Sequence, residues 1–251
     1  MSADLIEKAI AGDRLALSRL ITAAVDAPST GLLDRLAELR KGAPIVGVTG
    51  PPGAGKSTLV DRLVTHYRSR GARPGLVLID PSSPFTGGAI LGDRVRMQAH
   101  SDDPDVFMRS LATRGQLGGL AAGADAALAA LDLAGFTPLI LETVGVGQSE
   151  LDVVNVADTV VVVLHPTWGD EVQANKAGLI EAGDIFVVNK SDLSDPHRTV
   201  TQIEQALELG TRTSWTPRVV ATSAGSGQGI GALVEAIEGH QSHLATHSSI
   251  A

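Results

Sequence analysis

The chain contains 251 residues, of which 20 are Lys or Arg and 28 are Asp or Glu, so its formal net charge is −8. This acidic balance argues against a general nucleic-acid binder, and the lack of Cys excludes disulfides, thiolate catalysis and thiolate-bound metals. The N-terminus has no signal-peptide core and the apolar runs are only strand-sized, so we expect a cytoplasmic protein that engages no membrane.

The first 41 residues carry apolar side chains at helical spacing. The pattern begins near Leu5, breaks at 27–31 and resumes at Leu32. It predicts two helices within residues 4–41. We expect residues 1–42 to form an N-terminal helical extension that packs and carries no chemistry.

Residues 43–239 alternate between strand-sized apolar runs and helical stretches. The strand candidates are 45–49, 76–80, 106–110, 139–142, 160–165, 185–189 and 218–222. Strands that are apolar on both faces and joined by helices indicate a parallel sheet covered on both sides. We therefore expect a doubly wound α/β fold with a mostly parallel sheet of about seven strands, whose ligands bind at the carboxyl ends of the strands.

A glycine-rich segment follows the first strand. Residues 50–57 read GPPGAGKS, which matches G-x-x-x-x-G-K-[ST] between a strand and a helix. The glycines let backbone N–H groups converge on phosphate oxygens, and the helix adds its positive dipole end. Lys56 is expected at the β- and γ-phosphates and Ser57 at magnesium. The sequence thus predicts a P-loop NTPase with phosphate contacts from Gly53, Ala54, Gly55, Lys56, Ser57 and Thr58.

Three acidic side chains follow at positions where a magnesium ion and its waters are expected. Asp80 and Glu142 each end a predicted strand, and Asp93 closes a glycine-rich loop. Because magnesium keeps several waters, we expect these carboxylates to hold waters more than the ion itself. A helix cap or a turn is the alternative role for such an Asp.

The loop after Glu142 contains Gly145, whose N–H could donate to the γ-phosphate and so make the loop sensitive to that phosphate. Spacing alone assigns no side chain as the base that activates water. Hydrolysis is therefore expected to be slow unless a partner completes the site.

The segment NKSD, residues 189–192, ends another apolar strand. The Asp192 carboxylate can accept from both the N1–H and the exocyclic amine of guanine, whereas adenine has no such donor pair. Asn189 and Lys190 would brace the loop, and the N–H groups of Ser223 and Ala224 could meet the guanine carbonyl oxygen. Since mismatched buried donors and acceptors are costly, the sequence favours guanine over adenine.

The polar tail, residues 240–251, has histidines at 240, 243 and 247. A metal site is one interpretation of this spacing. We expect a frayed end instead.

Several long segments together resemble the MeaB/ArgK family, the chaperone GTPases of adenosylcobalamin-dependent acyl-CoA mutases. They are TGPPGAGKSTL, IDPSSPFTGGAILGDRVRM, FMRSLATRGQLGG, ILETVGVGQSE, PTWGDEVQANKAG and FVVNKSDL. The resemblance is close over about residues 44–193 and looser elsewhere, and these segments are far more specific than the GTPase motifs inside them.

The resemblance implies a GTPase that uses GTP, GDP and magnesium. It implies docking on methylmalonyl-CoA mutase or a relative, with control of cobalamin loading and protection or rescue of the mutase. The cobalamin adenosyltransferase is a second implied partner. Members of the family usually dimerise through a C-terminal helical extension, whereas this sequence ends at Ala251. We therefore expect the usual dimer contacts to be absent or replaced, and a homodimer is one interpretation.

Site roles follow from the resemblance by motif. Lys56 and Ser57 would carry the phosphate and magnesium roles, and Asp80, Asp93 and Glu142 the metal and hydrolysis roles. A further loop at 169–176 would relay the nucleotide state to the partner through Asp170, Glu171 and Lys176. Without the resemblance, the acidic pair is the ordinary start of a solvated helix.

Two other functions remain open on the sequence. A nickel-type metal-insertion GTPase has a similar core, but such proteins usually carry Cys and His ligands near the nucleotide. An ATP-dependent kinase would need an acceptor site and no guanine-reading loop.

Overall fold

The computed structural model describes residues 2–80, 98–112, 119–143, 153–166, 173–209 and 214–247. The chain divides into two compact units. The first unit comprises Met1–Ile45 and Tyr67–Leu141, and the second comprises Val46–His66 and Glu142–Ala251.

The first unit begins with three helices instead of the two that we expected: α1 (Ser2–Ile10), α2 (Arg14–Asp26) and α3 (Thr30–Glu38). The additional break lies at Gly12, which has a φ of 94°, and at Asp13. The Asp13 carboxylate accepts hydrogen bonds from the N–H groups of Leu15 and Ala16, at 2.9 and 3.0 Å. Asp13 therefore caps α2 and starts a new helix where apolar spacing alone suggested continuity.

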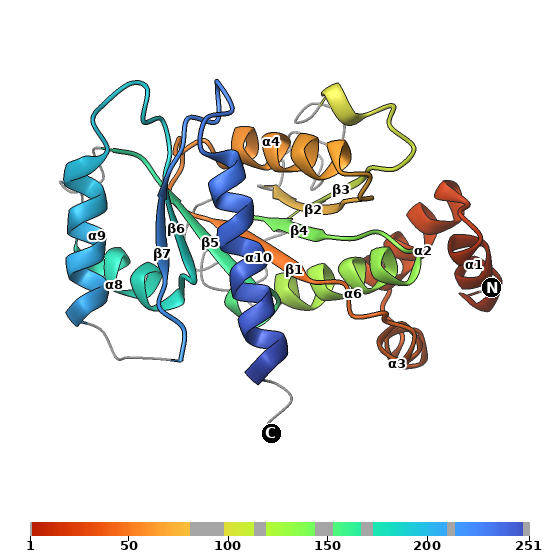
Figure 1. Cartoon of the computed structure of the whole chain (residues 1–251). Coiled ribbons are helices and arrows are strands. Elements are labelled where there is room, and N and C mark those ends of the chain that lie inside the picture. The colour runs from red at the N-terminus through yellow and green to blue at the C-terminus, as the bar shows by residue number, and fades with distance from the viewer. Residues whose placement is uncertain are drawn as a thin grey trace. The chain divides into compact units, whose positions relative to one another are not determined.

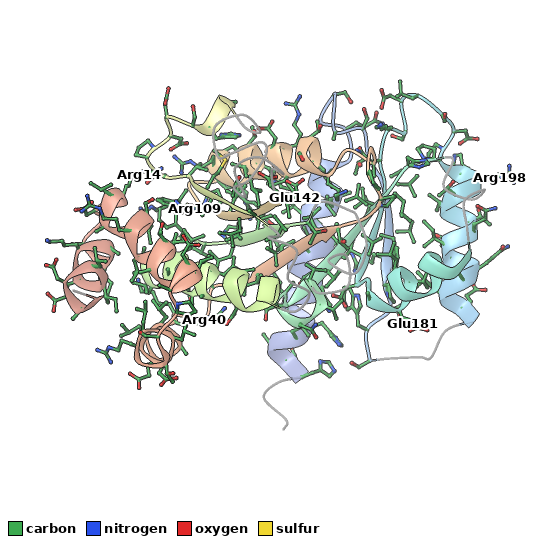
Figure 2. The ribbon with its side chains drawn as sticks, turned by 180° about the vertical axis from the view of Figure 1, so that it is seen from behind. Arg14, Arg40, Arg109, Glu142, Glu181 and Arg198 are labelled. Atoms are coloured by element: carbon green, nitrogen blue, oxygen red, sulfur yellow. The ribbon has the colours of Figure 1, made fainter. Side chains whose placement is uncertain are left out.

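The N-terminal helices are fastened to the rest of the first unit by arginines (Figure 2). Arg14 donates to the backbone oxygens of Pro104 and Val106, at 2.7 and 2.9 Å. Arg109 donates to the hydroxyls of Ser18 and Thr22 on α2, at 3.2 and 2.8 Å. These bonds fix α2 to the strand that carries Arg109.

The remaining elements of the first unit are β2 (Gly75–Asp80), the short 3₁₀ helix η1 (Gln98–His100), β3 (Phe107–Ala112), α6 (Gly119–Leu133) and β4 (Leu139–Glu142), of which Glu142 belongs to the second unit. β2 and β3 pair in parallel. α6 packs against α2, α3 and β2. All six residues of β2 are buried, as expected for a strand covered on both faces.

The second unit contains β1 (Ile45–Thr49, without its first residue), most of α4 (Lys56–Ser69), η2 (Val153–Asn155), β5 (Thr159–Leu164), α8 (Gln173–Ala182), β6 (Ile185–Val188), α9 (His197–Leu209), β7 (Arg218–Ala221) and α10 (Ile230–His247). β1 pairs with β5, β5 with β6 and β6 with β7, all in parallel. α9 packs on β6 and β7, and α10 contacts β5, β6 and β7 (Figure 1).

Within the part of the chain that the structure describes, seven parallel strands form one sheet in the order β3-β2-β4-β1-β5-β6-β7. The predicted α/β P-loop fold is thereby confirmed, and the predicted strands lie within two residues of the observed ones. No helix among the described residues is long and apolar enough to cross a membrane.

The C-terminal helix α10 extends to His247, whereas we expected a frayed tail from residue 240. His240 is buried, its Nδ1 is hydrogen-bonded to the Thr159 hydroxyl at 2.9 Å, and its ring lies 4.8 Å from that of Trp215. A residue that counts as polar in the sequence therefore packs as core. The described residues contain no group of three or more His, Cys, Asp or Glu arranged to hold a metal ion.

Candidate nucleotide-binding site

The predicted phosphate loop lies between β1 and α4, and α4 begins at Lys56. Gly50 has a φ of 133°, and a Cβ there would lie 2.1 Å from the backbone oxygen of Val163. Gly55 has a φ of 92°, and a Cβ there would lie 2.5 Å from Asn189 Nδ2. Both positions therefore require glycine for backbone conformation and for space.

The Lys56 side chain folds back over this loop. It is buried, and its Nζ donates to the backbone oxygens of Gly50 and Pro51 at 2.7 and 3.0 Å. The ammonium group is thus held directly beside the amides that a phosphate would contact. Negatively charged phosphate oxygens would be stronger acceptors for it than these carbonyls.

Ser57 and Glu142 form the oxygen-rich part of the site. The Ser57 hydroxyl donates to Glu142 Oε1 at 2.5 Å, and the Glu142 carboxylate is buried at the end of β4 (Figure 2). Next to it, the Thr143 N–H donates to the backbone oxygen of Val48 at 3.0 Å, and the hydroxyls of Thr143 and Thr49 are 3.0 Å apart. A hydroxyl and a carboxylate are oxygen donors of the kind that magnesium prefers.

The predicted base-reading segment is fixed to the phosphate loop through one side chain. Asn189 is buried, and its Nδ2 donates to the backbone oxygen of Ala54 at 2.9 Å. Its Oδ1 accepts from the Thr222 hydroxyl and from the Ala224 N–H, both at 3.0 Å. Asn189 therefore joins the phosphate loop, its own strand end and the loop after β7.

The backbone turns sharply after Asn189. Lys190 has a φ of 61°, in the left-handed region that a non-glycine residue rarely adopts. The Ser191 N–H donates to the backbone oxygen of Thr222 at 3.0 Å, which closes the turn. Asp192 follows on the surface and is exposed, so its carboxylate is accessible to a ligand.

The loop after β7 is closed mainly by its own hydrogen bonds. The N–H of Ser223 donates to the backbone oxygen of Gln228 at 3.0 Å, and the N–H of Ala224 is bonded to Asn189 as described. Both N–H groups that we expected to donate to the guanine oxygen thus donate to acceptors inside the protein.

Sequence reasoning missed Arg62, which contacts this loop from α4. Its Nε donates to the backbone oxygen of Ala224 at 2.9 Å and its Nη2 to that of Gly225 at 2.8 Å. No sequence signal identifies it, because its partners are main-chain carbonyls 162 and 163 residues away.

The other predicted site residues divide into two groups. Asp80 is a buried residue that ends β2 in the first unit. The remaining predictions fall on Asp93, Gly145, Asp170 and Glu171, which lie outside the described residues, and on Lys176, whose backbone belongs to α8 but whose side chain is not described.

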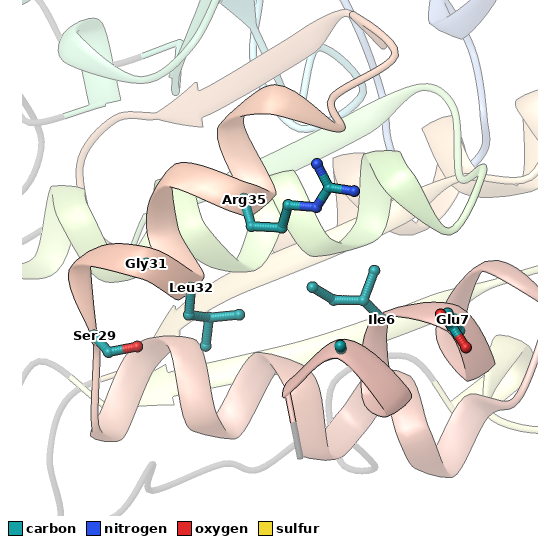
Figure 3. A pocket seen from close by; sticks show the side chains of 7 residues that line it. Ile6, Glu7, Ser29, Gly31, Leu32 and Arg35 are labelled. Carbon is teal, nitrogen blue, oxygen red and sulfur yellow. The ribbon is translucent and has the colours of Figure 1, made fainter.

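A separate pocket of about 500 Å³ lies in the first unit between α1 and α3 (Figure 3). Its lining is mostly apolar, with Ile6 and Leu32 opposite each other and Glu7 and Arg35 as the charged members. It includes none of the residues predicted to bind nucleotide. We assign it no role.

Comparison with known proteins identifies the family. The sequence profile described as "Methylmalonyl Co-A mutase-associated GTPase MeaB" matches residues 14–250. A Pyrococcus horikoshii protein with a provisional GTPase name is 46% identical over 99% of this chain and 80% of its own length. The GTPase ArgK of Escherichia coli is 36% identical over 94% of this chain and 74% of its own length.

A solved structure described as a LAO/AO transport system kinase supports the same fold. It superposes with a TM-score of 0.78 at 28% identity, and the match covers 98% of this chain and 76% of that one. The profile match spans nearly the whole chain, including the phosphate loop and the NKSD segment. The chain therefore belongs to the methylmalonyl Co-A mutase-associated MeaB family of GTPases.

Proposed function

We propose that GTP binds with its triphosphate on residues 50–57 and its guanine on the loops at 189–192 and 222–226. The observation that carries this proposal is the Asn189 side chain, which holds Ala54 of the phosphate loop and Ala224 of the second loop at hydrogen-bonding distance. One rigid amide sets the spacing between the two parts of the site. Such preorganisation lowers the cost of binding a ligand that spans both parts.

In this proposal, Lys56 exchanges its carbonyl partners for phosphate oxygens, and Ser57 and Glu142 hold magnesium or its waters. The donor set fits the ion, because both side chains offer oxygen. When bound, magnesium would supply positive charge at the β- and γ-phosphates. Asp80 and Asp93 serve metal and hydrolysis roles, and the Gly145 N–H reports whether a γ-phosphate is present.

The nucleotide state acts on a partner enzyme. We propose that the protein gates cobalamin loading into methylmalonyl-CoA mutase or a relative, and protects or reactivates that mutase. Asp170, Glu171 and Lys176 relay the nucleotide state to the mutase. The cobalamin adenosyltransferase is the second proposed partner, and hydrolysis is slow without the mutase. The family match, which names association with methylmalonyl-CoA mutase, supports this proposal over a nickel-insertion protein or a kinase.

The nucleotide part is tested by titration calorimetry of the whole chain with GDP and ADP in the presence of magnesium. We expect micromolar-range GDP binding and little ADP binding. Equal affinities would contradict the assignment of the base-reading loop.

The partner part is tested by capture of a purified adenosylcobalamin-dependent mutase on the immobilised protein. Capture should differ between GDP and a non-hydrolysable GTP analogue. Absence of capture with either nucleotide would count against the chaperone role while leaving the nucleotide site intact.

A further inference from the structure

Arg62 connects two parts of the candidate site that are remote in sequence. It lies in α4, the helix that starts at Lys56, and its side chain is half-buried. Its guanidinium donates to two consecutive backbone oxygens, those of Ala224 and Gly225, at 2.9 and 2.8 Å. A planar fork with nitrogens in fixed positions suits two adjacent carbonyls, whereas the ammonium group of a lysine is a point charge without that geometry.

The turn that Arg62 contacts is also closed by hydrogen bonds of its own: the Ser226 hydroxyl donates to the backbone oxygen of Ser223 at 3.2 Å, and the Gln228 N–H donates to that hydroxyl at 3.4 Å. Gly225 has no side chain, and a Cβ built on it would have no heavy atom within 4 Å. On one side of it, Asn189 Oδ1 holds the Ala224 N–H. On the other side, the Gly227 N–H donates to the backbone oxygen of Ser223 at 2.8 Å. Between these anchors, the backbone oxygens of Ala224 and Gly225 both accept hydrogen bonds from Arg62.

Orientation of these peptides determines where their N–H groups point. A trans peptide is planar, and its C=O and N–H point in opposite directions. With the oxygens of Ala224 and Gly225 directed at Arg62, the N–H groups of Gly225 and Ser226 are directed away from it. Backbone donors held in a fixed direction bind an oxygen acceptor without paying the entropy of ordering the loop.

We propose that Arg62 is a positioning residue for base recognition: its fork on Ala224 and Gly225 fixes the 222–226 loop in the form that accepts guanine, and couples that loop to the helix of the phosphate loop. This inference rests on the proposed function and adds to it a residue outside the nucleotide-binding motifs. The phosphate contacts do not depend on Arg62, since they come from residues 50–57.

The test uses the whole chain and its R62M and R62K variants. R62M keeps an apolar stem and removes every donor, and R62K keeps the charge and removes the fork. Arg35→Ala is the matched control, because it removes one positive charge from an exposed position in the first unit. Calorimetry measures the affinities for GDP, ADP and inorganic pyrophosphate, and thermal unfolding without nucleotide reports the stability of each variant.

For R62M we expect GDP affinity about tenfold weaker, which is the scale of one charge-assisted hydrogen bond. Pyrophosphate affinity should be unchanged, so the preference for GDP over ADP falls by the same factor. R62K should lose part of this preference, and Arg35→Ala none of it. A merely structural brace would instead weaken GDP and pyrophosphate alike.

An R62M or R62K protein with the wild-type preference for GDP would overturn the inference while leaving the nucleotide site in place. Equal weakening of GDP and pyrophosphate would also overturn it. If R62M fails to fold, the ratio of GDP affinity to ADP affinity in R62K decides the question. A wild-type protein without preference for GDP would contradict the proposed function itself, and the inference with it.

Discussion

Both the donor and the acceptor of the Asn189 side-chain amide form hydrogen bonds, which explains why an asparagine occupies this position. Its nitrogen donates to a carbonyl of the phosphate loop, and its oxygen accepts from a hydroxyl and a backbone N–H of the loop after β7. An aspartate could not donate to Ala54, and a leucine could make none of these bonds. Because the side chain is buried, any unpaired end would carry a desolvation cost of about 1–3 kcal/mol.

Asp192 allows a direct test of base recognition at the level of one residue. Asp192→Asn replaces an acceptor-only carboxylate by an amide that both donates and accepts. Xanthine carries a carbonyl oxygen where guanine has its exocyclic amine, so the variant should lose GDP affinity and gain affinity for xanthosine diphosphate. We expect the preference between the two nucleotides to shift by a factor of about 100 or more, as measured by competition binding.

Asp195→Asn, a neighbouring aspartate whose carboxylate caps the His197 N–H, is the matched control and should leave that preference unchanged. A variant Asp192→Asn that retains the guanine preference would show that another group reads the base.

The roles of residues in short local motifs could be predicted from the sequence, whereas hydrogen bonds to backbone groups of distant loops could not. Lys56, Ser57 and Asn189 lie in local motifs, so the pattern alone indicated a phosphate loop and a base-reading turn. The partners of Arg62 and the directions of the Ser223 and Ala224 amides depend on how a distant loop closes. No local pattern encodes that closure.

At the level of elements, burial on both faces made the strands easy to predict. β6 and, after Thr159, β5 are continuous apolar runs, as is typical of parallel strands buried on both faces. The break between α1 and α2 was missed because it depends on the Asp13 cap and not on a change in apolar spacing. The end of α10 was missed because His240 looks polar in the sequence but packs in the core.

A buried carboxylate ties α6 to the segment after α3. Asp132 accepts hydrogen bonds from the N–H groups of Lys41, Gly42 and Ala43, at 2.7, 2.9 and 3.3 Å. Asp132→Asn keeps the shape of the side chain but places the amide NH₂ group against the backbone N–H groups that donate to the carboxylate. We therefore expect a loss of about 1–3 kcal/mol in the free energy of unfolding, measured by urea denaturation.

Asp125→Asn on the same helix is the matched control. Asp125 pairs with Arg40 at 2.9 Å and is more than half exposed, so its loss should cost less than about 1 kcal/mol. If both substitutions lowered the free energy of unfolding equally, the buried hydrogen bonds of Asp132 would contribute no more to stability than the exposed ion pair of Asp125.

The packing of α10 on β5 predicts a pH dependence. Burial, more than any other cause, lowers the pKa of His240 below its usual 6.5. Asp184, 3.4 Å from its Nε2, and Asp158 oppose this shift, while His243 adds to it. The native state therefore disfavours the protonated ring, and stability falls as the pH drops below 6.5, the ordinary pKa that applies to the unfolded chain.

His240→Phe retains a ring beside Trp215 and cannot be protonated. From pH 8 to pH 5.5, the melting temperature of the wild type should fall relative to that of this variant, as measured by calorimetry. Burial also raises the pKa of Asp184 above its ordinary 3.8. Protonation of this carboxyl at low pH therefore favours the native state, in the opposite direction to the effect of His240. The comparison of the two proteins removes most of that contribution, since Asp184 is present in both. An unchanged difference would show that the pKa of His240 is the same in the native and unfolded states, and a relative rise of the wild type at pH 5.5 would show that folding raises this pKa.

At the scale of the whole molecule, the chain passes between two compact units several times. Each unit is assembled from segments that are far apart in the sequence. Contiguous sequence patterns could indicate the order of strands and helices, but not this grouping, which depends on contacts. The described groups that we place at the phosphates and the base, including Lys56, Asn189 and Ala224, belong to the second unit, as does Glu142, which we place at magnesium. Asp80, to which we give a metal role, belongs to the first unit.

This grouping predicts an uneven response to nucleotide. A ligand whose contacts lie mainly in the folded second unit stabilises that unit by up to about 2.7 kcal/mol at 100 times its dissociation constant. Hydrogen exchange with GDP and magnesium should therefore slow by up to about 100-fold in β5, β6 and β7, whose amides exchange when that unit opens. Amides of α2 and β3 in the first unit should slow much less. Lys56→Ala with GDP provides the control, since it removes the ammonium group of the phosphate contact, and the exchange rates of this variant without nucleotide report whether its fold is retained. Equal slowing in both units would mean that they open as one cooperative structure, and no slowing in either would place the nucleotide elsewhere.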